Sequence, residues 1–341
     1  MRPTSFLASL ALLALTPVAL AAQQPTTHDL RMVPANVHWG HFDAKVAPVL
    51  RIRSGDRVRV ETMVARGLER PRLAGLGDRD FDARELAVEA GVRERGPGPH
   101  PMTGPIFVEG AEAGDLLEVR LEEIRYLSTW GVSGFLPGGG TLPDDFPYGE
   151  IRLFELDTVA GVARMTSSGH RIPMAPFFGT IGVAPPVLTG RVGTSAPGAF
   201  TGNVDNKDLI AGTTIYVPVL VDGALLSIGD GHAAQGDGEV SGTAIETSLS
   251  GTVQVILHKG GGRRWPRGET PTHWMSMGLH VDLDEAARIA VAEMVDFLVR
   301  EKGMTRADAY ILCSAALDLR VTQLVDGTKG IHGMLSKAVV P

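Results

Sequence analysis

Apolar residues recur along the chain in short runs, and glycine, proline or aspartate separates these runs between about residues 28 and 256. Alternation of apolar and polar positions with a period of two is typical of strands that bury one face, and the breaks are typical of turns. The clearest such segments, all rich in β-branched or aliphatic residues, are 49–52, 57–62, 105–109, 116–124, 214–220 and 252–257. The pattern predicts a mainly β structure for this part of the chain.

The pattern changes to helical spacing near the C-terminus. In the segment 282–301 the apolar residues form one stripe, and Gly303 follows it as a stop signal. An apolar run at 309–319 comes next. Each segment begins with two residues spaced as a helix cap, Asp282 with Glu285 and Thr305 with Asp308. We expect a helical hairpin that packs on a sheet face and supports the functional site without contributing to it.

Two glycine- and proline-rich stretches lack apolar periodicity. The first, 131–147, contains isolated large apolar residues, which favours an ordered surface or active-site loop over a disordered linker. The second comprises residues 177–179 and 185–202.

The first 21 residues have the order of a secretory signal. Arg2 precedes the apolar run 6–15, and small residues at 19–21 precede a polar segment. We expect cleavage near Ala22 and a periplasmic or secreted protein with no further membrane contact, the alternative being an uncleaved anchor. The remaining residues, 22–341, suffice for one large domain or two closely packed ones.

Composition excludes two further classes. Cys313 is the single cysteine, so the chain forms no internal disulfide, and its apolar surroundings predict a buried residue. The formal net charge is −7 with dispersed basic residues, which argues against a nucleic-acid partner. The densest basic segment, 263–267, is expected to be a solvated loop.

The segment 226–239 is the most informative for chemistry. An apolar strand leads into four glycines interleaved with one histidine, His232, and the acids Asp230, Asp237 and Glu239. Glycine lets the backbone approach a ligand, and carboxylate and imidazole donors can converge on a cation. Asp230 and His232 are two apart, so on an extended chain they point to the same side. The alternative is an ordinary hairpin turn with solvated acids.

Further candidate ligands must come from other segments, because a catalytic metal usually takes three protein ligands. The candidates are His38, His41 and Asp43, then Glu61, His100, Asn203 and Asp205. No Gly-x-Ser-x-Gly elbow is present, and the glycine runs 138–140 and 260–262 lack the other features of a phosphate loop. A serine nucleophile near His170 has nothing to orient a base.

Five blocks of sequence, taken together, resemble the acetamidase/formamidase family over nearly all of residues 22–341. They are 38–43, 103–111, 202–206, the turn 229–239, and 318–326. The resemblance implies one catalytic domain with a β-rich α/β fold of the swivelling β/β/α type. It also implies an amide hydrolase that releases ammonia and a short carboxylate, with a divalent metal, zinc first and calcium second.

Residue type and resemblance together give three sets of expected site residues. The metal ligands are expected to be Asp230, His232, Glu61 and His38. The catalytic residues are expected to be Glu239, Asp237 and Asn203, with Glu239 passing a proton from water to the leaving nitrogen. Asn203, or a glycine amide of the turn, is expected to donate to the oxyanion. The substrate contacts are expected to be His100, Thr103 and Asp205.

The expected partner is a small amide, and we expect a homo-oligomer. Two other hypotheses stay open from sequence alone. One is an exported protein that binds a small ligand without turnover, and the other is a structural domain stabilised by calcium.

Overall fold

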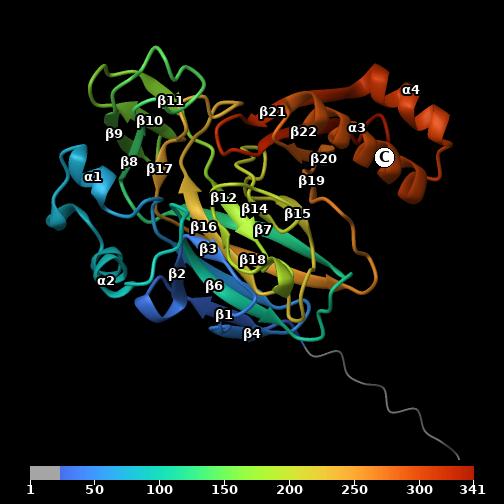
Figure 1. The fold of residues 1–341 in the computed structure, drawn as a ribbon, viewed down its shortest axis with the longest axis horizontal. Coiled ribbons are helices and arrows are strands. Elements are labelled where there is room, and N and C mark those ends of the chain that lie inside the picture. The colour runs from blue at the N-terminus through green and yellow to red at the C-terminus, as the bar shows by residue number, and fades with distance from the viewer. Residues whose placement is uncertain (1–23) are drawn as a thin grey trace, which may run out of the picture.

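Two large β-sheets form the body of the protein (Figure 1). The computed structural model describes residues 24–341, so the predicted signal 1–21 lies outside the described residues. In spatial order, the nine strands of the first sheet are β1 (Thr27–Leu30), β5 (Arg57–Thr62), β18 (Leu249–His258), β7 (Leu116–Tyr126), β15 (Thr213–Pro218), β19 (Arg267–Glu269), β20 (His273–His280), β22 (Lys329–Ser336) and β21 (Leu317–Gln323).

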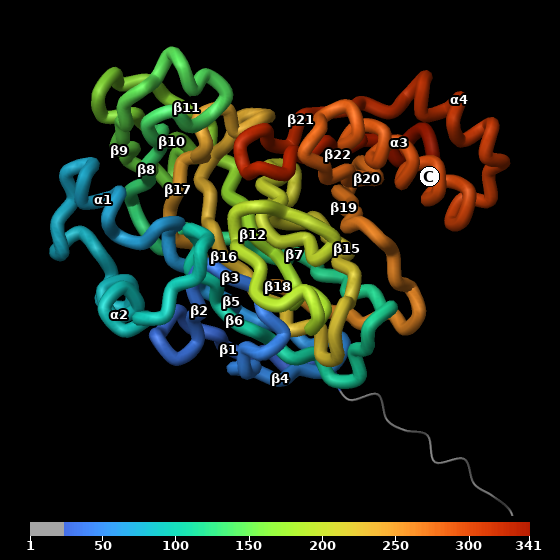
Figure 2. The backbone as a smooth tube through the Cα atoms, viewed as in Figure 1, coloured from blue at the N-terminus to red at the C-terminus, as the bar shows by residue number. Residues whose placement is uncertain are grey.

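The second sheet contains eleven strands and holds the functional site. Its main path is β11 (Arg171–Pro173), β10 (Val162–Met165), β9 (Glu150–Asp157), β8 (Trp130–Phe135), β17 (Glu246–Thr247), β16 (Leu226–His232), β12 (Phe177–Gly182) and β14 (Thr201–Asn203). The branch strand β6 (Pro101–Val108) pairs with β16, β2 (Val37–Trp39) and β4 (Leu50–Ile52). A separate pair joins β3 (His41–Phe42) to β13 (Val192–Gly193). In Figure 2 the blue β2 and the teal β6 lie beside the much later β16.

Period-two alternation explains how the first sheet meets the second. In β5, Val58, Val60 and Thr62 are fully buried, whereas the residues between them are partly or fully exposed. Leu226 and Ile228 of β16 belong to the same apolar cluster as these valines. Burial of this cluster drives the packing of the two sheets.

A pair of helices packs on the strands β20 and β22 of the first sheet. Helix α3 (Leu283–Lys302) begins at Asp282, whose side chain accepts a hydrogen bond from the Glu285 amide, and α4 (Arg306–Ala316) begins at Thr305. Gly278 of β20 permits the close approach of α3, because a Cβ there would collide with the carbonyl oxygen of Ala286. The two helices and β22 share one apolar cluster, which includes the buried Cys313.

The β-rich α/β fold and the C-terminal helical pair predicted from sequence are confirmed. Three details differ. Two helices, α1 (Glu69–Leu73) and α2 (Ala83–Gly91), were not predicted; residues 317–323, expected in part as helix, form β21; and 177–179 begin β12. The short 3-10 helices are η1 (Pro34–Asn36), η2 (Asp78–Asp80) and η3 (Val187–Thr189). Within residues 24–341, no helix combines the length and apolar composition that crossing a bilayer requires.

Candidate active site

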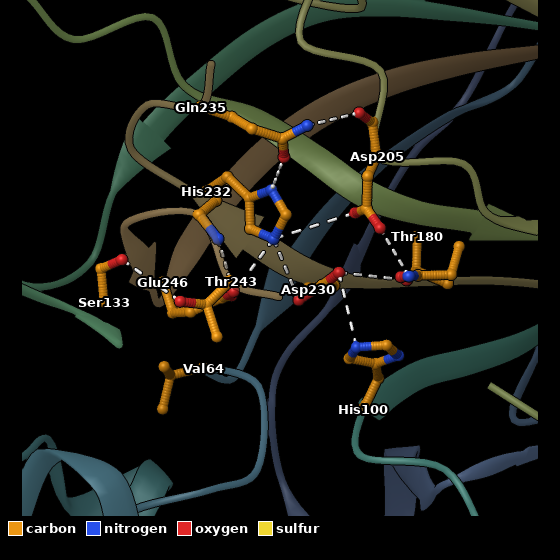
Figure 3. Close-up of polar contacts among 12 residues, drawn as sticks. Val64, His100, Ser133, Thr180, Asp205, Asp230, His232, Gln235, Thr243 and Glu246 are labelled. Carbon is orange, nitrogen blue, oxygen red and sulfur yellow. Dashed lines mark hydrogen bonds and ion pairs between the residues drawn. The ribbon is translucent and has the colours of Figure 1, made fainter. Parts of the chain in front are cut away.

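Strand β16 supplies the first two residues of a buried polar centre (Figure 3). Asp230 and His232 lie on the same side of the strand, as their spacing predicted, with Nε2 of His232 3.3 Å from Oδ1 of Asp230. Both side chains are at most 2% exposed. The ring of Phe177, on the neighbouring β12, packs edge-on against the imidazole at 4.9 Å and limits its rotation.

Two further carboxylates approach the same imidazole from other strands and loops. Glu246 is the cross-strand partner of His232, and its Oε2 lies 3.1 Å from Nε2. Asp205 follows β14, and its Oδ1 lies 3.9 Å from the same nitrogen. Glu239 joins Asp205 and His232 in a second group whose donor atoms all lie within 4.8 Å of one another.

Several acids of the centre have unusual backbone conformations. Asp205, Asp230 and Glu239 have φ angles of 47°, 60° and 46°. A residue other than glycine in this region costs about 1–3 kcal/mol and persists only where its surroundings hold it there. Such residues concentrate at functional sites, and three of them meet here.

Gln235 orients the imidazole of His232. Its side-chain nitrogen donates to the carbonyl oxygen of Asp205 at 2.8 Å, so its Oε1 faces Nδ1 of His232 at 3.1 Å and accepts from it. With Nδ1 as the donor, Nε2 is the nitrogen that faces the carboxylates; burial lowers the pKa of His232, but the charges of Glu246 and Asp230 outweigh it and raise this pKa well above its usual range. An imidazole held in this way is a typical arrangement for metal binding.

Four buried atoms of the centre have no hydrogen-bond partner among the described residues: Oδ1 of Asp205, Oδ1 of Asp230, Nε2 of His232 and Oε2 of Glu246. The three carboxylate oxygens lie around Nε2 of His232, at 3.1, 3.3 and 3.9 Å, and a buried polar atom without a partner costs about 1–3 kcal/mol. A cation held by Asp230, His232 and Glu246 would satisfy three of them, and Asp205 belongs with His232 and Glu239 to the neighbouring group. Gly179 leaves room for a cation, because a Cβ there would lie 2.6 Å from Oδ2 of Asp230 and would also collide with Asp205. The residues present therefore fit a divalent metal.

Burial and mutual repulsion dominate the electrostatics. Burial, followed by the charges of Glu239 and Asp326, raises the pKa of Asp205 well above its usual range. Burial and the charge of Asp326 also raise the pKa of Glu239 well above its usual range. Burial raises the pKa of Asp326 to about 7. Burial opposes ionisation of Asp230 too, but His100 and His232 hold its pKa below the usual range. Excess negative charge in the centre thus favours a cation or bound protons.

The centre lies in the wall of a cavity of about 200 Å³. Residues from four further parts of the chain contribute to the wall: 65–70, 136–140, 241–243 and 325–326. Gly238 joins the segment that leads to residues 325–326 to the turn that contains Glu239. The amide of Gly238 donates to the carbonyl of Val321, and the carbonyl of Gly238 accepts from the amide of Leu324. The stretch 131–147 was predicted to be an ordered surface or active-site loop. Its middle part lines the cavity, whereas its first residues belong to β8.

The structure brings six of the expected site residues to this cavity or its centre. They are Asn203, Asp205, Asp230, His232, Glu239 and His100. The Asn203 amide is engaged at both ends, since it donates to Asp205 and accepts from Thr180, each at 2.5 Å. It therefore positions Asp205, which differs from the oxyanion contact expected from sequence.

Four expected site residues lie elsewhere. Glu61 binds Arg84 at 2.5 Å, because strand alternation turns it away from the face of Val60 that packs between the sheets. His38 contacts Ser227 at 2.9 Å. Thr103 is buried and donates to the carbonyl of Glu61 at 2.7 Å. Asp237 is 42% exposed and faces Lys207 at 3.4 Å.

His41 and Asp43, the other members of the first block, also stay outside the cavity. His41 contacts the carbonyl of Trp39 at 2.9 Å, and Asp43 faces Arg191 at 3.7 Å.

Sequence reasoning missed Glu246, Gln235 and Asp326. Glu246 stands between alanine, isoleucine and threonine in a short segment, and an acid in such surroundings is a weak signal of a site. Its pairing with His232 is long-range and is invisible in the sequence. Asp326 is the last residue of the block 318–326, and nothing in its neighbours along the chain indicates a role in the site.

Comparison with solved structures defines the class of protein. The chain matches an acetamidase of Yersinia enterocolitica with a TM-score of 0.79 and 31% identity, over 94% of this chain and 95% of that one. The β-rich fold and the buried histidine–carboxylate centre thus belong to a hydrolase that acts on linear amides.

More particularly, the chain belongs to the acetamidase/formamidase family, whose sequence model matches residues 29–189 and 189–338. It is 28% identical to a formamidase of Methylophilus methylotrophus over 306 residues, 70% of this chain and 71% of that protein. It is 30% identical to a formamidase-like protein of Schizosaccharomyces pombe over 216 residues, 48% of this chain. The latter match spans about half of the relative, 52% of its length. The resemblance inferred from the five blocks is confirmed.

Proposed function

We propose that this protein hydrolyses a short linear carboxamide to ammonia and a carboxylate at a divalent metal centre. The observation that supports the metal is the convergence of buried, unpartnered donor atoms of Asp230, His232 and Glu246, with Asp205 on the other side of the same imidazole. Glu239 lies beside these donors, grouped with Asp205 and His232, and we assign it to proton transfer and not to the metal. The imidazole favours zinc over calcium, because calcium prefers oxygen ligands alone.

The residues of the chain have distinct tasks in this proposal. A divalent metal held here would polarise the amide carbonyl and make hydroxide available at neutral pH. Gln235 holds Nδ1 of His232 as a donor, so Nε2 is the nitrogen turned toward the metal position, and Asn203 fixes Asp205. Glu239, a buried carboxyl in the cavity wall, transfers a proton from water to the leaving nitrogen, a role that contributes about 10²- to 10⁴-fold in rate.

The cavity limits the size of the substrate. An engineered cavity of about 150 Å³ in another protein holds a benzene ring, so a cavity of about 200 Å³ admits about six to eight non-hydrogen atoms. Formamide and acetamide fit this limit, which supports a substrate like those named for the relatives.

Chelation and metal replacement test the proposal. Ammonia release from formamide, acetamide and longer amides should disappear in metal-free protein and return with zinc. The variant His232→Ala should stay folded and lose activity, whereas Asp237→Asn, whose side chain lies outside the cavity, should keep it. Full activity of a protein shown to be metal-free would overturn the metal centre.

We also propose, from the pattern of residues 1–21, that the protein is exported to the periplasm or the medium. Cell fractionation and the intact mass of the native protein test this. A cytoplasmic protein that retains residue 1 would contradict it. The expected homo-oligomer stays a prediction, to be tested by light scattering.

A further inference from the structure

Two arginines in the cavity wall have no partner among residues 24–341. Arg70, on α1, is only 7% exposed, yet its guanidinium makes no hydrogen bond and no ion pair within 4.0 Å with any described residue. Arg66, which is exposed, likewise has no side-chain partner there. By contrast, Arg263 and Arg267, which are 14% and 17% exposed, both pair with Glu301.

The backbone between β5 and α1 places both side chains at the cavity. Arg66 has a φ angle of 61°, and its amide donates to the carbonyl of Pro99 at 2.9 Å. This backbone conformation is rare for a residue other than glycine, and here it leads the chain into α1. Both arginines line the same cavity as Asp230, Glu239 and Glu246.

An unpaired guanidinium in such a place is costly. Burial, followed by the charge of Arg66, lowers the pKa of Arg70 to about 10, so Arg70 remains charged at neutral pH. A buried charge normally has an opposite charge bound to it. Glu246 and Glu239 act on Arg70 through space, but neither is within ion-pair distance. An anion that enters the cavity would supply such a partner.

We propose that Arg70, assisted by Arg66, forms a carboxylate-binding subsite of the cavity. A guanidinium can bind a carboxylate through two parallel hydrogen bonds, and it suits this anion better than an ammonium does. This inference rests on the proposed function. Hydrolysis adds water across the carbon–nitrogen bond: the new carbon–oxygen bond gives a carboxylate, and the nitrogen leaves as ammonia and is protonated to ammonium.

The carboxylate can have two sources. It is either the product of every turnover or a second group on the acyl part of the substrate. The second source implies a monoamide of a short dicarboxylic acid. Succinamate has eight non-hydrogen atoms, which is the upper limit estimated for a cavity of about 200 Å³.

Steady-state kinetics with metal-loaded protein test the subsite. The variants are Arg70→Met, Arg70→Lys and, as a matched control, Arg306→Met on the surface of α4. The first arm measures the inhibition constant of acetate against acetamide. The second compares kcat/KM for succinamate with that for butyramide, which has a methyl group in place of the carboxylate. A third readout, independent of turnover, is the rise in unfolding temperature caused by acetate.

Arg70→Met is expected to raise the inhibition constant of acetate about 10- to 100-fold and to abolish the acetate-induced rise in unfolding temperature. Arg70→Lys should restore part of both, and Arg306→Met should change neither. If the substrate supplies the carboxylate, the preference for succinamate over butyramide falls by a similar factor. If the carboxylate comes only from the product, the native protein shows no preference for succinamate over butyramide.

The subsite is refuted if Arg70→Met changes acetamide turnover and acetate inhibition equally, because Arg70 then only balances the charge of the centre. It is also refuted if folded Arg70→Met binds acetate as the native protein does. Absence of ammonia release from every amide contradicts the proposed function instead, while acetate binding still reports on Arg70.

Discussion

Gly179 gives a direct test of the metal centre, because an added methyl group would occupy the space between its donors. In Gly179→Ala the new Cβ would lie 2.6 Å from Oδ2 of Asp230 and 2.8 Å from Cε1 of His232, and it would collide with Oδ1 of Asp205. The φ angle of Gly179 is outside the left-handed region, so alanine fits the backbone itself. The substitution therefore perturbs the donors and little else.

The size of the expected effect follows from the overlap between the new Cβ and the three groups. Ordinary contacts are about 3.5–4.0 Å, so each of the three groups must retreat by about 1 Å. A misplacement of about 1 Å in a catalytic arrangement costs about 100-fold in rate, and overpacking lowers the free energy of unfolding by about 1–3 kcal/mol. We expect folded Gly179→Ala with kcat/KM reduced about 100-fold and a markedly lower zinc content.

The assay combines ammonia release, metal analysis of the purified protein and thermal unfolding. Gly236→Ala is the matched control, because it lies in the turn after His232 and a Cβ there would meet nothing within 4 Å. Native activity and native zinc content in Gly179→Ala would refute the inference that these donors hold the metal.

Three further predictions concern groups around the centre and away from it. Gln235→Ala should reduce zinc affinity or kcat/KM about 10- to 100-fold, because His232 loses its orienting acceptor; competition with a coloured chelator measures this. Asp208 has a pKa of about 2, lowered from 3.8 chiefly by a hydrogen bond from His332, so its stabilising effect is complete above about pH 4 and is lost as the pH falls through 2. Asp208→Asn should therefore lower the free energy of unfolding by about 2 kcal/mol at pH 6 and reduce its loss between pH 4 and pH 2; urea titration measures both, and an unchanged pH profile would contradict the assignment. Cys313→Ser should destabilise the C-terminal cluster by about 1–3 kcal/mol and leave kcat unchanged, whereas loss of turnover in folded protein would indicate a catalytic thiol.

Local patterns in the sequence predicted the elements but not their partners. Alternation identified residues 57–62 and 116–124 as strands, and capping pairs located the starts of α3 and α4. The same signal at Asp82 and Glu85, which begins α2, was overlooked within a β-rich stretch. Strand order depends on long-range pairing: β18 lies between β5 and β7, and nothing in the three sequences specifies this.

The site residues show the same difference between local pattern and long-range pairing. Asp230 and His232 were predictable because two residues on one strand share a face and glycines surround them. Glu61 has the right chemistry and the wrong face, since the next residue, Thr62, is the buried one. Glu246 reaches His232 only through the pairing of β17 with β16, so residue type could not identify it.

The link from Gly238 to Val321 and Leu324 has a consequence for how the protein matures. It joins two turns that are distant in sequence, and neither turn can complete the wall of the cavity alone. Because contacts of such long range are slow to form, a partly folded chain lacks this wall, and until β16 pairs with β17 it also lacks the contact that brings Glu246 to His232. Loading with metal is thus expected to follow assembly of the sheets, and a rescue of misfolded protein by added zinc alone should fail.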